Sequence, residues 1–314
     1  MTLRFFLVRN EPMKKTLSIQ SNYQLLDSGH QLKLEKINDL LMVRPCPQAI
    51  WNSELPVEQW QIAQHLCHRQ NDGGGKWEHR SKKPDDFFLP FHFQIGEESL
   101  QLEFKISLTN FGHLGIFFEQ VSIWEIVLKE LISIEKKIPF AERKKYYFIN
   151  LFAYTGALSS IVAKRGFSVI HVDSSKSILE WAQLNAKVNK VDDRIHFVHD
   201  DCNNYLKKII KNKLNVVGIL ADPPSWGHGI KKEKWIFEEH ISLFNHMIAE
   251  AMTNSTYFYL LSSHTHGVQA NSLKNLLNQI SLGETTADEL GIKHHTGNRI
   301  LPAGIYALTN KKII

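Results

Sequence analysis

The sequence contains few cysteines. Its 314 residues include three cysteines, Cys46, Cys67 and Cys202. Their number is odd, and they lie far apart along the chain. This spacing excludes a disulfide framework and a cysteine-based metal knuckle, and it favours a reducing compartment, so a cytoplasmic location is expected. The 16 histidines lack partners at metal-ligand spacing, and we therefore expect no metal site.

Long hydrophobic runs are also absent. The first segment, MTLRFFLVRNEP, has one short apolar run, Phe5 to Val8, flanked by Arg4 and Arg9. Such a run is too short for a secretory core or a membrane span, so no membrane partner is expected. With 43% hydrophobic and 22% charged residues and no internal repeats, the chain has the composition of a globular protein. Its net charge of +5 is compatible with an anionic partner.

Residues 1–119 are predicted to form a small β-rich domain with a possible role in substrate recognition. Apolar and polar residues alternate from Leu100 to Leu108, and Gly96 separates this run from FHFQI, which predicts a hairpin. Ser28 and Gly29 predict a second turn, between YQLL and QLKLE.

A glycine-rich basic stretch, RQNDGGGKWEHRSKKPDD, covers residues 69–86. Its glycines do not lie between a strand and a helix, as a phosphate-binding loop would, so a solvated loop is the first interpretation. The alternative is that the lysines and arginines around Trp77 contact a nucleic-acid backbone and a base. The stretch GIKKEKW, residues 229–235, offers the same two interpretations.

Residues 120–314 have a different pattern and are predicted to form the catalytic domain, with a bridging helix over 121–137. Short apolar runs alternate there with helical patterns: YYFINLF, SVIHV, RIHFV, NVVGILA, TYFYLLS and GIYAL. This alternation predicts an α/β fold with a Rossmann-like, doubly wound and mostly parallel sheet. Ligands of such sheets bind beyond the carboxyl ends of the strands, and several polar loops lie at these positions.

The first two loops are AYTGALS and HVDSS. Gly156 allows a close backbone approach before a helix N-terminus, but the loop lacks the GxGxxG pattern of dinucleotide sites. Asp173 ends the next strand, where a carboxylate accepts hydrogen bonds from ribose hydroxyls. Alternatively, Asp173 or Ser174 caps the following helix.

The other two loops are HDDCN and ADPPSW. One of Asp200 and Asp201 is expected to accept a hydrogen bond from an adenine amino group, while the other caps a helix. Asp222 stands before two prolines, whose carbonyl oxygens have no competing N–H donors of their own. With Trp226 as a stacking face, this corner suits a flat ring that carries N–H donors.

Five segments of the chain resemble one family. FINLFAYTGALS, HVDSSKSILEWAQLNA, DDCNNYLKK, ILADPPSWGHG and NRILPAGIYAL are similar to class I S-adenosylmethionine-dependent methyltransferases related to the bacterial 23S ribosomal RNA large subunit methyltransferase I. The segments YQLLDSGHQLKLE, RPCPQAIW and GIFFEQ resemble the β-rich module of the same relatives. This resemblance implies S-adenosylmethionine as cofactor and a class I methyltransferase fold.

The resemblance also implies roles for individual residues. For the cofactor these are Phe152, Ala153, Tyr154, Thr155 and Gly156 around the methionine part, Gln120 near its end, Asp173 with Ser174 at the ribose, and Asp201 with Cys202 at the adenine. For catalysis they are Asp222, Pro223 and Pro224, facing the donor methyl and the target, and Trp226 beside the substrate.

Two departures from the family pattern affect these expectations. Trp226 stands where phenylalanine or tyrosine is usual, which keeps a stacking face but changes the pocket size. Relatives that methylate carbon five of cytosine use a cysteine nucleophile after a late strand, and YLLSSHTHG has none. We therefore predict that the chain does not methylate cytosine through covalent addition.

The expected function is S-adenosylmethionine-dependent methylation of a nucleobase of RNA, with ribosomal RNA favoured, by direct in-line transfer. RNA is the expected partner. Two alternatives are a nicotinamide-dependent oxidoreductase on a similar sheet, which the missing GxGxxG disfavours, and a non-catalytic RNA-binding module.

Overall fold

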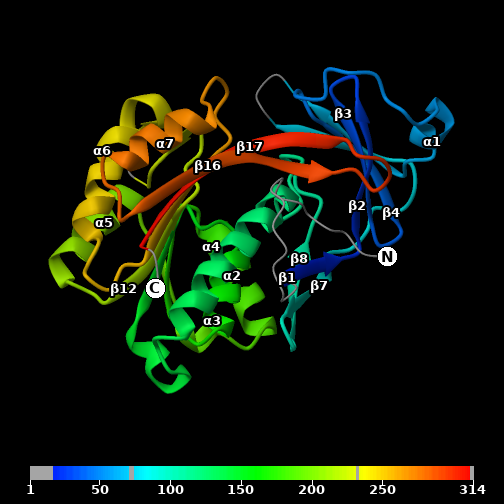
Figure 1. Cartoon of the computed structure of the whole chain (residues 1–314). Helices are drawn as coiled ribbons and strands as arrows, with labels where there is room; N and C mark the ends of the chain where they lie inside the picture. The colour runs from blue at the N-terminus through cyan, green and yellow to red at the C-terminus, as the bar shows by residue number, and fades with distance from the viewer. Residues whose placement is uncertain (1–16, 71–73, 231–232, 312–314) are drawn as a thin grey trace. The chain divides into compact units, whose positions relative to one another are not determined.

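The computed structural model describes residues 17–70, 74–230 and 233–311 (Figure 1). Contacts divide these residues into two units. The first contains the described residues up to Glu125 together with Leu290–Ala303, and the second contains Ile126–Glu289 and the residues from Gly304 onward. The division falls inside helix α2 (Val121–Glu135), close to the boundary predicted at residues 119–120.

Two sheets and the short helix α1 (Val57–Gln61) lie in the first unit. A three-stranded antiparallel sheet has the order β1 (Leu17–Ser21), β7 (Phe87–Ile95), β8 (Glu98–Ile106). A five-stranded sheet has the order β2 (Tyr23–Gly29), β3 (Leu32–Ile37), β4 (Leu40–Pro45), β5 (His65–Arg69), β6 (Gly75–His79). The predicted β-rich character of this part of the chain is confirmed.

The predicted hairpin forms between β7 and β8, with Gly96 at positive φ in the turn. The second predicted turn is wrong in position. The chain turns at His30 and Gln31, which both have positive φ, because Gly29 is still in β2. A Cβ at Gly29 would collide with the backbone of Ser53, so this glycine allows a close approach within the unit.

A seven-stranded sheet forms the centre of the second unit, with the order β11-β10-β9-β12-β15-β17-β16. Its strands are β9 (Tyr147–Leu151), β10 (Ser168–Asp173), β11 (Ile195–His199), β12 (Val216–Ala221), β15 (Phe258–Ser263), β16 (Glu284–Lys293) and β17 (Ile300–Asn310). The strands from β9 to β15 pair in parallel and β17 pairs antiparallel to β15. The six strands predicted for this part are all present, and β16 was not predicted.

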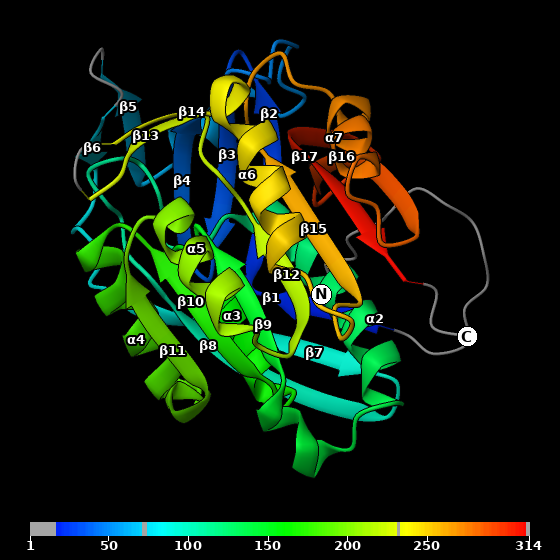
Figure 2. The same ribbon diagram turned by 90° about the vertical axis from the view of Figure 1, so that its left-hand side faces the viewer.

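Helices cover both faces of this sheet (Figure 1). On one face lie α3 (Ala157–Lys164) and α4 (Lys176–Val188). On the other lie α5 (Cys202–Asn212), α6 (Phe237–Ala251) and α7 (Ala270–Asn278), whose apolar sides share one core with the strands. Figure 2 shows α5 and α6 lying across the strands. The sheet and its flanking helices confirm the predicted Rossmann-like fold.

The order of the strands fixes the position of the ligand site. From β9 the chain moves outward through β10 and β11, and β12 then starts the other half of the sheet beside β9. Leu151 and Ala221 are paired neighbours at the carboxyl ends of these two strands. The loops that begin at Phe152 and Asp222 therefore leave the sheet side by side, at its topological switch point.

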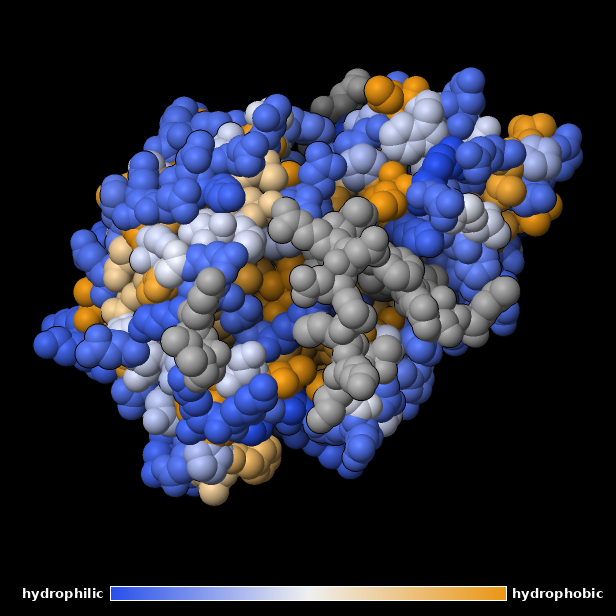
Figure 3. All heavy atoms as spheres, viewed as in Figure 1, coloured by the Kyte–Doolittle hydropathy of each residue, from blue (hydrophilic) through white to orange (hydrophobic). Residues whose placement is uncertain are grey.

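Described residues on the face shown in Figure 3 are mostly hydrophilic. Among the helices of residues 17–70, 74–230 and 233–311, none has the length and apolarity that a membrane crossing requires. The same ranges hold no cluster of three or more histidine, cysteine, aspartate or glutamate side chains that fits a metal ion.

Candidate active site

The loop after β9 has an unusual backbone. Phe152, Tyr154 and Gly156 have φ angles of 54°, 52° and 78°, so left-handed residues alternate with ordinary ones. Each non-glycine residue in this region costs on the order of 1 kcal/mol or more, which the surrounding contacts must offset. Gly156 is the N-cap residue of α3, and no side chain caps this helix. The N–H groups of its first turn thus face an uncapped end that suits a carboxylate.

A buried polar chain supports this loop from below. The Nδ2 atom of Asn150 donates to the Ser159 hydroxyl at 2.9 Å, and this hydroxyl lies 2.9 Å from Nδ1 of His171. Burial lowers the pKa of His171 to about 3, so its ring is neutral at physiological pH. A Cβ at Gly156 would lie 3.2 Å from Cε1 of this ring. These hydrogen-bonded side chains fix the position of the loop relative to the sheet.

Asp173 connects the ends of β9 and β10. Its Oδ2 atom accepts from the Tyr154 N–H at 2.9 Å and its Oδ1 atom accepts from the Ser175 N–H at 2.9 Å. Burial raises the pKa of this carboxyl, while the two N–H groups oppose the rise. Each carboxylate oxygen has two lone pairs, so capacity remains for hydroxyl donors. The ribose role stays a prediction, and the N-cap of α4 is Ser175 rather than Asp173 or Ser174.

The two aspartates in the loop after β11 make different contacts. Asp201 caps α5, because its Oδ1 atom accepts from the N–H groups of Asn203 at 2.9 Å and Asn204 at 3.1 Å. Asp200 instead forms an ion pair with Lys208 at 2.7 Å. The predicted adenine contact of Asp201 stays a prediction and depends on its second oxygen.

The Cys202 thiol contacts the loop after β9. The side chain is buried, and its sulfur accepts from the Phe152 N–H at 3.3 Å. Burial raises the pKa of this thiol well above its ordinary value, so it stays protonated and unreactive. Its predicted contact with adenine stays a prediction. Because the thiol is buried and protonated, it is unsuited to act as a nucleophile.

The acidic proline corner, Asp222 to Pro224, follows β12. The Oδ1 atom of Asp222 accepts from the Ser262 hydroxyl at 2.7 Å and lies 3.7 Å from Nε2 of His264. The Asp222 side chain remains 22% exposed, so these contacts orient it without burying it. Ser262 and His264 were not predicted as site residues.

The two proline carbonyls of the corner differ. Pro224 accepts a hydrogen bond from Nε1 of Trp235 at 2.7 Å, so the prediction that both carbonyls are open is wrong. Among the described residues, no donor bonds the carbonyl of Pro223. The Asp222 carboxylate and the Pro223 carbonyl are thus two hydrogen-bond acceptors on adjacent residues.

Two tryptophans flank the corner in different ways. Trp226, in β13 (Trp226–His228), is 58% exposed and meets His228 edge to face, with ring centroids 4.6 Å apart. Its predicted role as a stacking face for the substrate stays a prediction. Trp235, in β14 (Lys234–Ile236), is buried and packs against Phe152 at 5.3 Å between centroids. Trp235 thus connects the corner to the loop after β9, a contact that its basic sequence surroundings did not indicate.

Gln120 lies in the 3₁₀ helix η1 (Phe118–Gln120), which belongs to the first unit. Its predicted position near the methionine end of the cofactor stays a prediction. The remaining predicted cofactor residues, Ala153 and Thr155, lie in the loop after β9.

The chain is similar in sequence to known methyltransferases. A sequence profile of the RNA cap guanine-N2 methyltransferase family matches residues 145–284. The ribosomal RNA large subunit methyltransferase K/L of Colwellia psychrerythraea is 28% identical over 59% of this chain, and that of Legionella pneumophila is 36% identical over 31%. The matches span 25% and 14% of these relatives, so the chain corresponds to about a quarter or less of their length.

Solved structures share the fold over nearly the whole chain. A SAM-dependent methyltransferase from Agrobacterium tumefaciens is 26% identical, with a TM-score of 0.81 over 93% of this chain and 91% of its own. The structure of SMU.776, a putative methyltransferase complexed with SAH, has a TM-score of 0.65 at 16% identity, over 92% of this chain and 75% of its own. The predicted resemblance and the class I methyltransferase fold are confirmed.

Proposed function

We propose that this chain, which has the fold of a class I S-adenosylmethionine-dependent methyltransferase, transfers a methyl group to an exocyclic amino group of a base in RNA. Ribosomal RNA is the favoured substrate, and a cytoplasmic location belongs to the same proposal. The observation that carries it is the pair of acceptors at the end of β12. The Asp222 carboxylate and the Pro223 carbonyl stand beside the loop after β9, where a cofactor of this fold binds.

The residues after β9 and β10 fit S-adenosylmethionine. The uncapped N-terminus of α3 would hold its carboxylate, and the left-handed loop brings backbone groups of residues 152–156 close to the methionine part. The remaining lone pairs of Asp173 would accept the ribose hydroxyls. Bound there, the cofactor supplies a methyl group on a positively charged sulfur.

The acidic proline corner would orient the acceptor. The two N–H bonds of an exocyclic amine would donate to Asp222 and to the Pro223 carbonyl, which turns the nitrogen lone pair toward the cofactor loop. The nitrogen becomes positive as it attacks, and the Asp222 carboxylate stabilises this charge. Ser262 donates a hydrogen bond that holds the carboxylate in place, the carboxylate would accept the proton that leaves the nitrogen, and Nε2 of His264 lies 3.7 Å from the same oxygen.

The substrate class is supported by chemistry and by relatives. Trp226 presents an exposed aromatic face, which suits a flat base. The matched profile is named for guanine-N2 methylation of RNA caps and the curated relatives for ribosomal RNA. The amino group of guanine is therefore the first acceptor to test.

The two other functions are less well supported. A nicotinamide-dependent oxidoreductase needs a pyrophosphate site, and the loop after β9 lacks the GxGxxG pattern. A non-catalytic RNA-binding module does not require a partly exposed carboxylate that Ser262 holds at the switch point.

Calorimetry and turnover separate these functions. We expect the purified chain to bind S-adenosylmethionine and not NADH, and to transfer labelled methyl groups to RNA from cells that lack the gene. Binding of NADH alone would support the oxidoreductase, whereas RNA binding without cofactor binding or transfer would support the non-catalytic module.

A further inference from the structure

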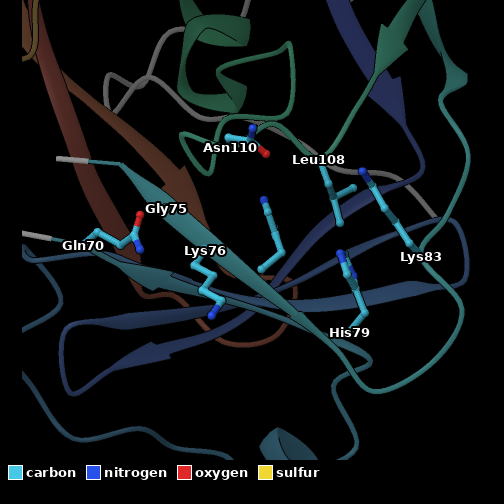
Figure 4. Close-up of a pocket in the computed structure, with 8 residues that line it drawn as sticks. Gln70, Gly75, Lys76, His79, Lys83, Leu108 and Asn110 are labelled. Carbon is cyan, nitrogen blue, oxygen red and sulfur yellow. The ribbon is translucent and has the colours of Figure 1, made fainter. Parts of the chain in front are cut away.

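A cavity of about 370 Å³ lies within the first unit, on the face of the sheet where β6 carries Trp77 and His79. Its size is within the range of sites that hold small ligands, which begins at roughly 300 Å³. The cavity lies in the glycine-rich basic stretch for which the sequence left two interpretations open. Figure 4 shows Lys83 and His79 on one side of it and Gln70 with Gly75 on the other.

Two parallel aromatic rings line this cavity. The rings of Trp77 and His79 have an interplanar angle of 8° and centroids 6.4 Å apart, as expected for residues i and i+2 on one face of a strand. A ring nitrogen at the edge of each ring makes a polar contact that fixes the ring. Nε1 of Trp77 donates to the Thr109 carbonyl at 2.8 Å, and Nδ1 of His79 is 3.0 Å from Nδ1 of His65. Rings fixed in this way lose little further freedom when a flat ligand stacks on them.

The charges at the cavity favour an anion. Lys76 and Lys83 line it, and no carboxylate does. Neither lysine forms a close ion pair within the described ranges, and the charge of Lys83 acts on Asp86, which does not line the cavity. Leu108 adds an apolar wall, and Asn110 contributes an amide that can bond the edge of a base.

We infer that this cavity binds an unpaired nucleotide of the RNA substrate, with the base against Trp77 and His79 and the phosphate at Lys83; the inference rests on the proposed function. Aromatic faces stack on any base, and lysines bind phosphate, so the contact is tolerant of sequence. A paired base cannot offer its face, so the cavity selects single-stranded segments.

The test measures binding of a short, fluorescein-labelled, single-stranded RNA to the full chain by anisotropy at several salt concentrations. Trp77→Leu removes the aromatic face, and we expect binding to weaken on the order of tenfold, with an unchanged salt slope. Trp77→Phe restores a face, and affinity returns toward that of the wild type.

Lys83→Ala tests the phosphate contact. We expect the slope of log affinity against log salt to fall by about 0.7, the value for one phosphate contact to a single strand. Lys82→Ala is the matched control, because this neighbouring exposed lysine does not line the cavity. If Lys82→Ala lowered the salt slope equally, the net charge of the protein would explain the effect, and the cavity site would be overturned.

Further arms separate the other outcomes. Equal binding by the Leu and Phe variants of Trp77, or equal binding of duplex RNA or of a poly-glutamate peptide, would also overturn the inference. Circular dichroism and thermal unfolding verify that each variant is folded. If the wild type transfers methyl groups to RNA while the variants bind RNA normally, only the cavity site fails. If binding depends on the cavity and no transfer occurs, only the proposed function fails.

Discussion

At the scale of single residues, the proposed chemistry depends on Asp222. Replacing it by alanine removes the carboxylate that orients the amine and stabilises its charge. We expect Asp222→Ala to lower kcat on the order of 100-fold or more, while the affinity for S-adenosylmethionine remains within a few-fold. Ser262→Ala, which removes only the 2.7 Å hydrogen bond to this carboxylate, should have a smaller effect. Full turnover by Asp222→Ala would refute the assignment.

Trp235 provides a second test at this scale. Trp235→Phe keeps an aromatic ring against Phe152 but removes the hydrogen bond to the Pro224 carbonyl. We expect kcat to fall about fivefold, the equivalent of roughly 1 kcal/mol, with unchanged cofactor affinity. Steady-state kinetics beside calorimetry measures both. An unchanged kcat would mean that the corner holds its shape without this bond.

The sequence predicted some of these residues and missed others for a physical reason. Asp222, Pro223 and Trp226 could be proposed from the sequence because they follow a buried strand at an edge that the fold class defines, and their roles stay predictions. Ser262 and His264 come from a segment about 40 residues further along the chain, and Trp235 is brought to the corner by the pairing of β13 with β14, so only the folded structure shows these contacts. The sequence does give one indication of His171 and Asn150, because each is a polar residue inside a mostly apolar strand.

At the scale of elements, the left-handed loop after β9 is the most constrained segment of the site. Gly156→Ala would place a Cβ at positive φ, 3.1 Å from the Ala182 Cβ. We expect the free energy of unfolding to fall by about 1 kcal/mol or more and the affinity for S-adenosylmethionine to fall with it. Gly297→Ala is the matched control, since φ is 77° there and nothing lies within 4 Å of the added Cβ. Equal cofactor affinity in both variants would contradict the role of the loop.

The polar chain that joins β9, α3 and β10 makes stability depend on pH. The pKa of His171 is about 3 in the folded state and roughly 6.5 when unfolded, so between these values the unfolded state binds one more proton. The free energy of unfolding should therefore decrease below pH 6.5, by up to about 1.4 kcal/mol per pH unit from this residue. Denaturant titrations at several pH values should show a shallower decrease for His171→Gln. An equal decrease in both proteins would contradict the buried neutral ring.

At the scale of the whole molecule, the alternation of strands and helices was sufficient to predict the sheet and its class. β16 escaped prediction because this edge strand is mostly half-exposed and polar, and so lacks an apolar pattern. The assignment of Leu290–Ala303 to the first unit also could not be predicted. It depends on contacts such as the 2.9 Å hydrogen bond between Ser28 and His294, which joins residues far apart in the chain.

The central claim is that the corner presents an exocyclic amine to the methyl donor. It is tested most directly by incubating the purified chain with methyl-labelled S-adenosylmethionine and RNA from cells that lack the gene, followed by mass spectrometry of the nucleosides. The account predicts label on an exocyclic amino group, with N2-methylguanosine as the first product to seek. Label on a ring carbon or on ribose, or RNA that remains unlabelled while the cofactor binds, would contradict it.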